Sequence, residues 1–217
     1  MSLTRVCPID PSRPDPSLLQ EAVGALRRGA LVGFPTETFY GLGANAMDQE
    51  AVARVFRVKG RAGSKPLLIL VDSARMAESL ALELSDDART LMATHWPGPL
   101  TLVLRAAPEL PALLGAGTGT VGMRVPGHPV ALALVRAAGF PVTAPSANPS
   151  GAEPPTQAEE VRRFFDGKIE LILDGGPTAG GRPSTVLDLS VSPPRLIRPG
   201  AVQLPDFLTG VKPPPGR

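Results

Sequence analysis

The chain has 217 residues, enough for one hydrophobic core, and its 22 basic and 20 acidic side chains leave a net charge of +2. Because that charge is close to zero, binding of nucleic acid over the whole surface is not expected, and a basic function requires a local cluster of cations. One cysteine and two histidines exclude a disulfide framework and give no basis for a metal site, so no metal ligand is assigned.

The first half of the chain alternates predicted helices with short apolar strands. Residues 1–14 form an N-terminal extension, and Asp15-Pro16 then supplies an N-cap and a first-turn proline for a helix that ends before Gly29. Later helices follow aspartate or serine caps, and strands are predicted where short apolar runs lie between turn residues. The expected elements are helix 17–28, strand 30–34, loop 35–44, helix 49–58, strand 67–71, helices 73–82 and 85–95, and strand 100–104.

The second half ends in closely spaced strands, which indicate a mixed sheet instead of a purely parallel one. We therefore predict a single α/β domain with a mixed sheet and helices on its faces. No uncharged apolar run reaches the length of about 18 residues that a membrane helix needs, so we expect a cytoplasmic chain with no membrane segment. The elements expected here are strand 120–125, helix 130–139, strand 140–145, helix 157–165, strand 169–174, loop 175–183, strands 184–189 and 195–200, and a frayed tail at 206–217.

A cationic loop is the strongest functional signal. No acidic residue occurs between Ala51 and Val71, although that segment carries several cations, and such a local excess of charge is tolerated best where an anion binds. Arg54 and Arg57 are typical of a solvated helix face. In contrast, Lys59 and Arg61 flank a glycine and can point the same way in an extended loop, so we expect them to bind phosphates together with Lys65.

Two further segments follow predicted strands. The residues APSANPSG (144–151) have the composition of an ordinary turn, but they lie just past a strand end, where open α/β sheets bind ligands. Arg124 lies at another strand end and could form a surface ion pair or bind a carboxylate. The sequence shows no nucleophile–base pair, and no serine, histidine and acid can be assembled into a catalytic triad. The residues therefore favour catalysis by positioning and charge neutralisation at phosphorus.

The order of several motifs resembles one known family. PTETFYGLGANA, the pair Lys59 and Arg61 before KPLLILV, WPGPLTLVL, VGMRVPGHP, APSANPSG, STVLDL and LIRPGAV follow one another as in YrdC-like domains, the threonylcarbamoyl-AMP synthase family. The resemblance covers nearly the whole chain and is to the single-domain members, which places a YrdC-like domain at residues 15–205.

The resemblance implies a twisted open α/β fold with a positively charged cavity. It also implies that L-threonine, bicarbonate and ATP give threonylcarbamoyl-AMP and pyrophosphate, with Mg²⁺ carried on the ATP phosphates. A downstream tRNA threonylcarbamoyl transferase then completes the threonylcarbamoyladenosine modification of tRNA. The chain would therefore be a nucleotidyltransferase that acts in tRNA processing.

The family motifs imply roles for individual residues. The catalytic set is Lys59, Arg61, Ser146 and Asn148. ATP would be bound by Lys59, Arg61, Lys65, Thr120, Ser146 and Arg198. Threonine would be bound by Thr36, Thr38, Arg124, Ala144 and Ser184. The chain departs from the family pattern at Leu70, where many relatives have histidine, and at Pro154, where a serine is usual.

Two alternative functions stay open at this stage. The basic cavity could serve an RNA-binding module, whose affinity for tRNA would depend steeply on salt and which would not turn over ATP. The chain could also be a YrdC-like relative that acts on another carbamoyl substrate. The low aromatic content of 4% counts against the first, and the set Lys59, Arg61, Ser146 and Asn148 favours the synthase over the second.

Overall fold

The helices of the computed structural model, which describes residues 3–204, begin at the polar caps that the sequence provides. Asp15 accepts a hydrogen bond from the Ser17 N–H, Asp48 caps the next helix, and His128 Nδ1 accepts from the Val130 N–H at 3.2 Å. The helices are α1 (Pro16–Arg27), α2 (Gln49–Lys59), α3 (Ala74–Ser79), α4 (Asp86–His95), α5 (Pro129–Ala138) and α6 (Ala158–Phe165), with a 3-10 turn, η1, at Ala112–Gly115.

The strands form two hydrogen-bonded mixed sheets. A four-stranded sheet has the order β1-β8-β2-β3, and a six-stranded sheet has the order β10-β9-β5-β6-β4-β7. The strands are β1 (Arg5–Pro8), β2 (Val32–Pro35), β3 (Tyr40–Gly43), β4 (Leu68–Leu70), β5 (Leu100–Arg105), β6 (Thr120–Arg124), β7 (Val142–Thr143), β8 (Leu171–Asp174), β9 (Thr185–Asp188) and β10 (Arg195–Arg198). The predicted mixed α/β architecture with helices on the sheet faces is confirmed.

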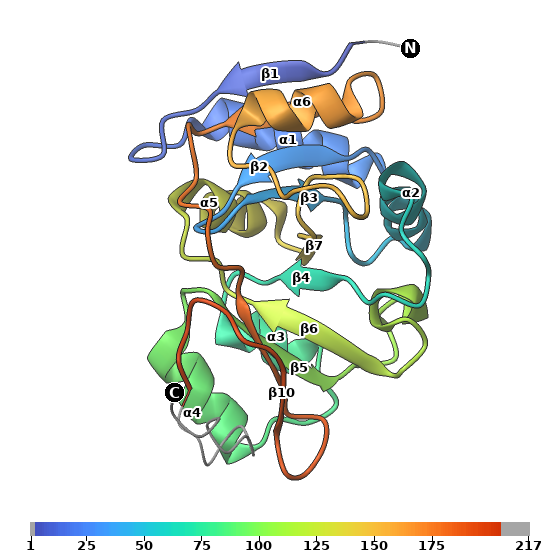
Figure 1. The fold of residues 1–217 in the computed structure, drawn as a ribbon, viewed down its shortest axis with the longest axis vertical. Helices are drawn as coiled ribbons and strands as arrows, with labels where there is room; N and C mark the ends of the chain where they lie inside the picture. The colour runs from blue at the N-terminus through green and yellow to red at the C-terminus, as the bar shows by residue number, and fades with distance from the viewer. Residues whose placement is uncertain (1–2, 205–217) are drawn as a thin grey trace, which may run out of the picture.

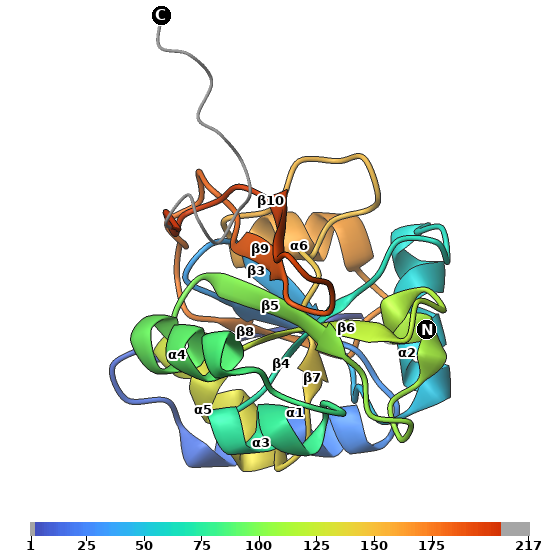
Figure 2. The ribbon, with the colours of Figure 1, turned by 90° about the horizontal axis from the view of Figure 1, so that it is seen from below.

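The two sheets follow one another along the long axis of the molecule (Figure 1). They meet where β3 lies beside the segment that contains β7: the Thr143 N–H donates to the Ala44 carbonyl at 3.0 Å, and the Leu42 N–H donates to the Pro145 carbonyl at 2.8 Å. In Figure 2, α6 lies on one side of the four-stranded sheet, and α1 and α5 lie on the other. Each side is filled by its own cluster of buried apolar residues.

Two strands differ from the sequence prediction. Residues 40–43, expected in a loop, form β3, which pairs antiparallel with β2. The N-terminal extension contains β1, which pairs parallel with β8. The predicted tail at 206–217 lies outside the described residues. Within residues 3–204, no helix is long and apolar enough to cross a membrane.

Candidate functional site

A cavity of about 1450 Å³ lies over one face of the six-stranded sheet. Side chains alternate between the two faces of a strand, and β5 places its leucines in the core. Its other residues line the cavity, and these are Thr101, Val103 and Arg105. The alternate residues of β6 do the same, namely Thr120, Gly122 and Arg124. Ligand pockets typically measure about 300–1,000 Å³, so this cavity has room for a nucleotide together with a second small molecule.

Nine of the twelve site residues predicted from the sequence line this cavity. They come from the β2–β3 turn, the loop after α2, β6, the segment after β7, and the β9–β10 region. In chain order they are Thr36, Thr38, Arg61, Thr120, Arg124, Ala144, Ser146, Ser184 and Arg198. The other three, Lys59, Lys65 and Asn148, are not among the residues that line the cavity.

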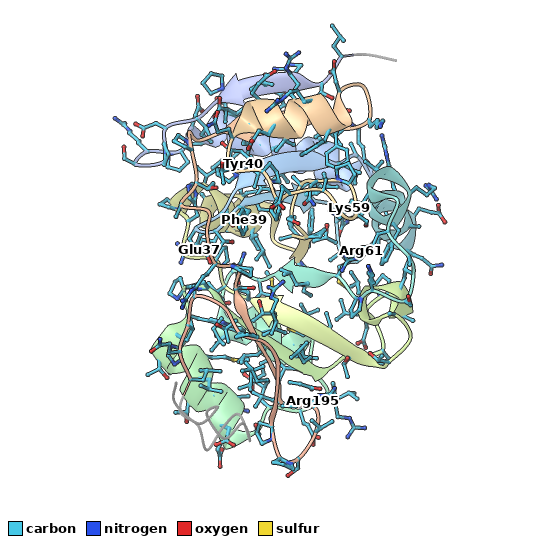
Figure 3. The ribbon with its side chains drawn as sticks, in the orientation of Figure 1. Glu37, Phe39, Tyr40, Lys59, Arg61 and Arg195 are labelled. Carbon is cyan, nitrogen blue, oxygen red and sulfur yellow. The ribbon has the colours of Figure 1, made fainter. Side chains whose placement is uncertain are left out.

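Lys59 lies directly behind the cavity wall at the end of α2 (Figure 3). Its ammonium group donates to the carbonyls of Ser146 and Asn148, and its own carbonyl accepts from the Ser150 N–H at 2.8 Å. Burial, together with the charge of Arg61, lowers the pKa of Lys59 to about 8. Since two of its three donors are occupied, Lys59 both shapes the 146–150 loop and retains one N–H for a ligand.

Arg61 closes the loop that follows α2. Its guanidinium donates to the Lys65 carbonyl at 3.1 Å and to the Pro66 carbonyl at 2.9 Å, and burial lowers its pKa. Gly60, with φ of 58°, is in the left-handed conformation that ends α2 and turns the chain toward this loop. The Lys65 side chain is exposed, so this loop directs only one of its two cations into the cavity wall.

The turn between β2 and β3 presents two threonine hydroxyl groups. Thr36 Oγ1 donates to the Phe39 carbonyl at 2.7 Å and accepts from the backbone N–H groups of Thr38 and Phe39. It also lies 3.1 Å from Thr38 Oγ1. These local bonds fix the backbone of the turn, so both threonines line the cavity while Glu37 between them does not.

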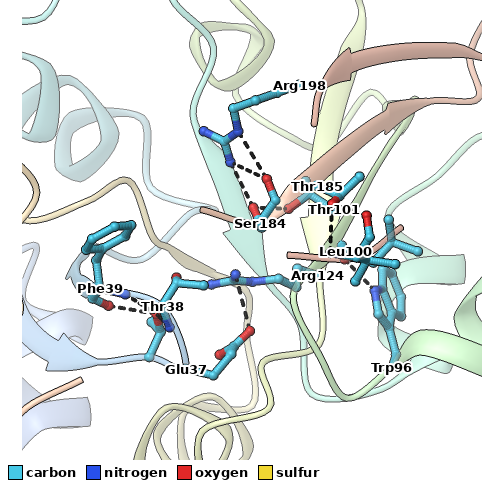
Figure 4. A network of polar contacts seen from close by, with 12 residues as sticks. Glu37, Thr38, Phe39, Trp96, Leu100, Thr101, Arg124, Ser184, Thr185 and Arg198 are labelled. Atoms are coloured by element: carbon cyan, nitrogen blue, oxygen red, sulfur yellow. Dashed lines mark hydrogen bonds and ion pairs between the residues drawn. The ribbon is translucent and has the colours of Figure 1, made fainter. Parts of the chain in front are cut away.

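Arg124 at the end of β6 is 3% exposed and forms an ion pair with Glu37, whose Oε1 lies 3.3 Å from Nη1 (Figure 4). Burial lowers the pKa of Arg124, and the charge of Glu37 opposes that shift. Of the two roles that the sequence left open for Arg124, the structure shows an ion pair, but a buried one whose arginine also lines the cavity. The pairing therefore leaves carboxylate binding available to this guanidinium.

Arg198 on β10 is joined directly to Ser184 (Figure 4). Its Nε and Nη2 donate to the Ser184 carbonyl at 3.1 and 2.8 Å, and Nη2 is 2.9 Å from Ser184 Oγ. Ser184 Oγ also lies 3.0 Å from Thr101 Oγ1. Burial and the charge of Arg124 both lower the pKa of Arg198, so the two arginines share one electrostatic environment.

Asn148 lies in the loop after β7, and the two residues that depart from the family pattern, Leu70 and Pro154, lie in the core and at the cavity, respectively. The Asn148 amide donates to the carbonyls of Pro149 and Ala152, and its Oδ1 is buried without a partner among the described residues. Leu70 is fully buried in the apolar cluster with α1 and α5, and it does not line the cavity. Pro154 does line the cavity and contributes no hydroxyl group.

Sequence reasoning missed Glu37 and Thr101, which contact the arginine and the serine of the site. Once β5 is assigned, the alternation of side chains along a strand predicts that the Thr101 side chain points to the same face as Val103 and Arg105. Glu37 lies in a turn, where no period fixes the side-chain direction. Its ion pair with Arg124 depends on a contact across 87 residues of sequence, from position 37 to position 124.

Known proteins resemble this chain over most of its length. The Sua5/YciO/YrdC family model, described as "Telomere recombination", matches residues 24–200. The threonylcarbamoyl-AMP synthase of Pyrococcus abyssi is 49% identical over 186 residues, which are 86% of this chain and 55% of that protein. A putative threonylcarbamoyl-AMP synthase of Mycobacterium tuberculosis is 44% identical over 83% of each chain.

Solved structures give the same result for the fold. P. abyssi Sua5 complexed with L-threonine superposes with a TM-score of 0.88 at 46% identity, covering 91% of this chain and 58% of that one. Escherichia coli YciO superposes with a TM-score of 0.84 at 29% identity, covering 95% of this chain and 100% of that one. The chain spans about half the length of the P. abyssi and Bacillus subtilis relatives, 55% in each case.

Proposed function

Because this chain belongs to the Sua5/YciO/YrdC family, we propose that it forms threonylcarbamoyl-AMP and pyrophosphate from L-threonine, bicarbonate and ATP. The product would supply the threonylcarbamoyladenosine modification of tRNA through a separate transferase. Curated relatives carry the name threonylcarbamoyl-AMP synthase, and one solved relative is described as a complex with L-threonine. Both support the proposal.

One observation carries the proposal: Arg61, Arg124 and Arg198 line a single cavity together with the hydroxyl groups of Thr38, Ser146 and Ser184. Two unit charges of the same sign 4 Å apart repel by about 4 kcal/mol at an effective dielectric constant near 20. A hydrogen bond to a charged group contributes about 1.5–3 kcal/mol. Several cations are therefore needed to hold two anionic reactants together, and this cavity provides them.

In the proposed reaction, the substrate supplies its own nucleophile. Bicarbonate takes up a proton and releases water to give carbon dioxide. The neutral amine of threonine adds to the carbon dioxide and loses a proton, which gives a carbamate. A carbamate oxygen then forms a bond to the α-phosphorus of ATP while the bond from that phosphorus to the β-phosphate oxygen breaks. Pyrophosphate leaves with the electron pair, so the protein has to position and neutralise charge and needs no covalent nucleophile.

We propose for the residues the roles that the family motifs imply, and most of these residues line the cavity. We assign the threonine carboxylate to Arg124, with Thr36, Thr38, Ala144 and Ser184 around the amino acid. We assign the phosphates to Lys59, Arg61, Lys65 and Arg198, with Thr120 beside the nucleotide. Ser146 would hold the nucleotide and the carbamate near the α-phosphate. The Asn148 amide already donates to the carbonyls of Pro149 and Ala152, so in this proposal Asn148 acts by holding the loop that presents Ser146. Lys65 is exposed, so in this proposal it contacts ATP only from the cavity mouth.

Mg²⁺ is proposed to enter with the nucleotide. Mg²⁺ prefers oxygen ligands and is commonly held by substrate phosphates and water. The cations of the cavity would then neutralise the part of the phosphate charge that Mg²⁺ does not neutralise. The transferase partner and direct contact with tRNA are likewise proposals that follow from the same function.

Pyrophosphate release tests the function. We expect release only when L-threonine, bicarbonate and ATP are all present. Removal of one hydrogen-bond donor that stabilises the charge of a transition state typically costs about 10²–10³ in rate, and we expect a loss of at least that size in Arg61→Ala. Arg89→Ala, which makes the same change in an exposed ion pair with Glu78, is the matched control and should leave the rate unchanged.

Pyrophosphate release that proceeds equally well without threonine would contradict the proposal. Salt-dependent binding of tRNA with no ATP turnover would favour the RNA-binding alternative instead.

A further inference from the structure

We propose that Glu37 is a positioning residue that holds the Arg124 guanidinium in the orientation that receives the carboxylate of the amino acid substrate. The inference rests on the proposed function, because it takes Arg124 to be the group that binds this carboxylate. Glu37 itself would not touch the substrate.

The first observation is that the Glu37–Arg124 pair is buried and incompletely bonded. Glu37 Oε1 lies 3.3 Å from Arg124 Nη1, yet both carboxylate oxygens and Arg124 Nε lack a hydrogen-bond partner among the described residues. A buried carboxylate without hydrogen bonds is unfavourable unless it compensates another charge. Arg124 is the cation that this carboxylate contacts, so we infer that compensating its charge is what keeps Glu37 in the site.

The second observation concerns the charges around Arg124. A guanidinium stays protonated in proteins, so a buried arginine needs a counter-charge or it moves toward water. The charge of Arg198 is close enough to interact unfavourably with that of Arg124. His128, whose environment also includes Glu37, uses Nδ1 to accept the Val130 N–H and offers no negative charge. Glu37 is therefore the compensating acid in this part of the structure.

The third observation is the direction from which Glu37 approaches. Thr36 and Thr38 line the cavity, whereas Glu37 does not, and Arg124 does. Figure 4 shows Glu37 on the side of Arg124 that faces away from Ser184 and Arg198. The hydrogen bonds of Thr36 Oγ1 fix the turn that carries Glu37. Glu37 thus lies against Nη1 as an ion pair from a position that does not line the cavity, and the guanidinium keeps N–H groups for a ligand.

Calorimetric titration with L-threonine and with L-threoninamide separates positioning of Arg124 from a general structural role. The amide lacks the negative charge that Arg124 would bind, so the ratio of the two dissociation constants reports carboxylate recognition alone. We expect the unmodified protein to bind L-threonine at least about tenfold more tightly than the amide. In Glu37→Gln that preference should fall to about threefold or less, with affinity for the amide nearly unchanged.

Two further variants complete the test. Glu37→Asp keeps the charge but shortens the side chain, so its preference should lie between those of Glu37→Gln and the unmodified protein. Glu78→Gln makes the same chemical change in an exposed ion pair with Arg89 and should keep the full preference. If Glu37→Gln does not fold, Glu37→Asp decides: a reduced preference supports the proposal and an unchanged one overturns it.

The outcomes distinguish this inference from the proposed function. An unmodified protein that binds neither compound, or binds both equally, overturns the threonine site and this inference with it. A full preference in the unmodified protein that persists in Glu37→Gln overturns the inference alone. Equal weakening of both ligands in Glu37→Gln would show a merely structural role and would also overturn it.

Discussion

The pKa of Lys59 gives a direct way to test ligand binding at the residue scale. Burial, with the charge of Arg61, lowers its pKa to about 8. In the free protein, burying the charged form of Lys59 lowers the free energy of unfolding at a pH below about 8. As the pH rises from about 8 toward 10.5, Lys59 loses its proton in the folded protein but keeps it in the unfolded chain, so this penalty disappears. A phosphate placed beside the ammonium group would reverse the shift and raise the pKa.

ATP binding should therefore take up protons in alkaline solution. At a pH of about 9 the free Lys59 is mostly neutral, and a phosphate contact would make it charged, so we expect uptake close to one proton. At a pH of about 7 Lys59 is already charged and uptake from it should be near zero. Calorimetry in buffers of different ionisation enthalpy measures this number.

The matched control for Lys59 is Lys59→Arg, which stays charged throughout this range. The extra uptake at alkaline pH should disappear in this variant. Proton uptake that is equal at both pH values, or that persists in Lys59→Arg, would contradict the assignment of Lys59 to the phosphates.

At the residue scale, the family motifs named nine residues that line the cavity of the candidate site. Arg124, Ser184 and Arg198 lie where strands β6, β9 and β10 place them around the cavity. Lys59 and Asn148 lie behind the wall, since each uses its polar groups in the 146–152 loop. The ion pair of Glu37 could not be predicted, because it joins Glu37 to a partner that is distant in the sequence and Glu37 lies in a turn without periodicity.

At the scale of elements, the β2–β3 hairpin positions the turn that carries Thr36 and Thr38. The close packing of this hairpin depends on Gly43. A Cβ atom at Gly43 would lie 2.8 Å from a ring carbon of Phe34 and 3.1 Å from Val142 Cγ1. Because Phe34 is fully buried, its ring has little room to move. The hairpin and the neighbouring β7 segment therefore approach one another only if this position has no side chain.

Gly43→Ala should destabilise the protein by about 1–3 kcal/mol through overpacking. Gly63→Ala is the matched control, since a Cβ there would meet only Leu113 at 3.9 Å. A surface change of this kind usually shifts stability by less than about 0.5 kcal/mol. Urea unfolding of both variants measures the difference, and similar free energies of unfolding would refute the role given to Gly43.

The helices could be predicted from their caps, and β1 and β3 could not. Asp15, Asp48, Ser73 and Ser85 each accept a backbone hydrogen bond in the first turn of a helix, so the local sequence was sufficient. β3 contains two glycines in four residues, a composition that usually weakens a strand. β1 pairs with β8, which lies near the other end of the sequence, so no local sequence pattern indicates this pairing.

At the scale of the whole molecule, the two mixed sheets follow one another and the cavity lies over the second. The sequence predicted the mixed α/β class from the order of helices and strands. It could not predict that the strands divide into two hydrogen-bonded sheets, because that division depends on which strands pair, and pairs such as β1 with β8 are distant in the sequence. The shared cavity of Arg61, Arg124 and Arg198 is likewise a property of the folded chain.

The central claim is that this cavity lets a carbamate of threonine attack the α-phosphorus of ATP. The most direct test incubates the protein with L-threonine, ATP and ¹³C-labelled bicarbonate and follows the products by mass spectrometry. We predict a threonylcarbamoyl adenylate that carries one ¹³C atom and forms in equal amount to pyrophosphate. Pyrophosphate with no labelled adenylate, or an adenylate that contains threonine but no ¹³C, would contradict the account.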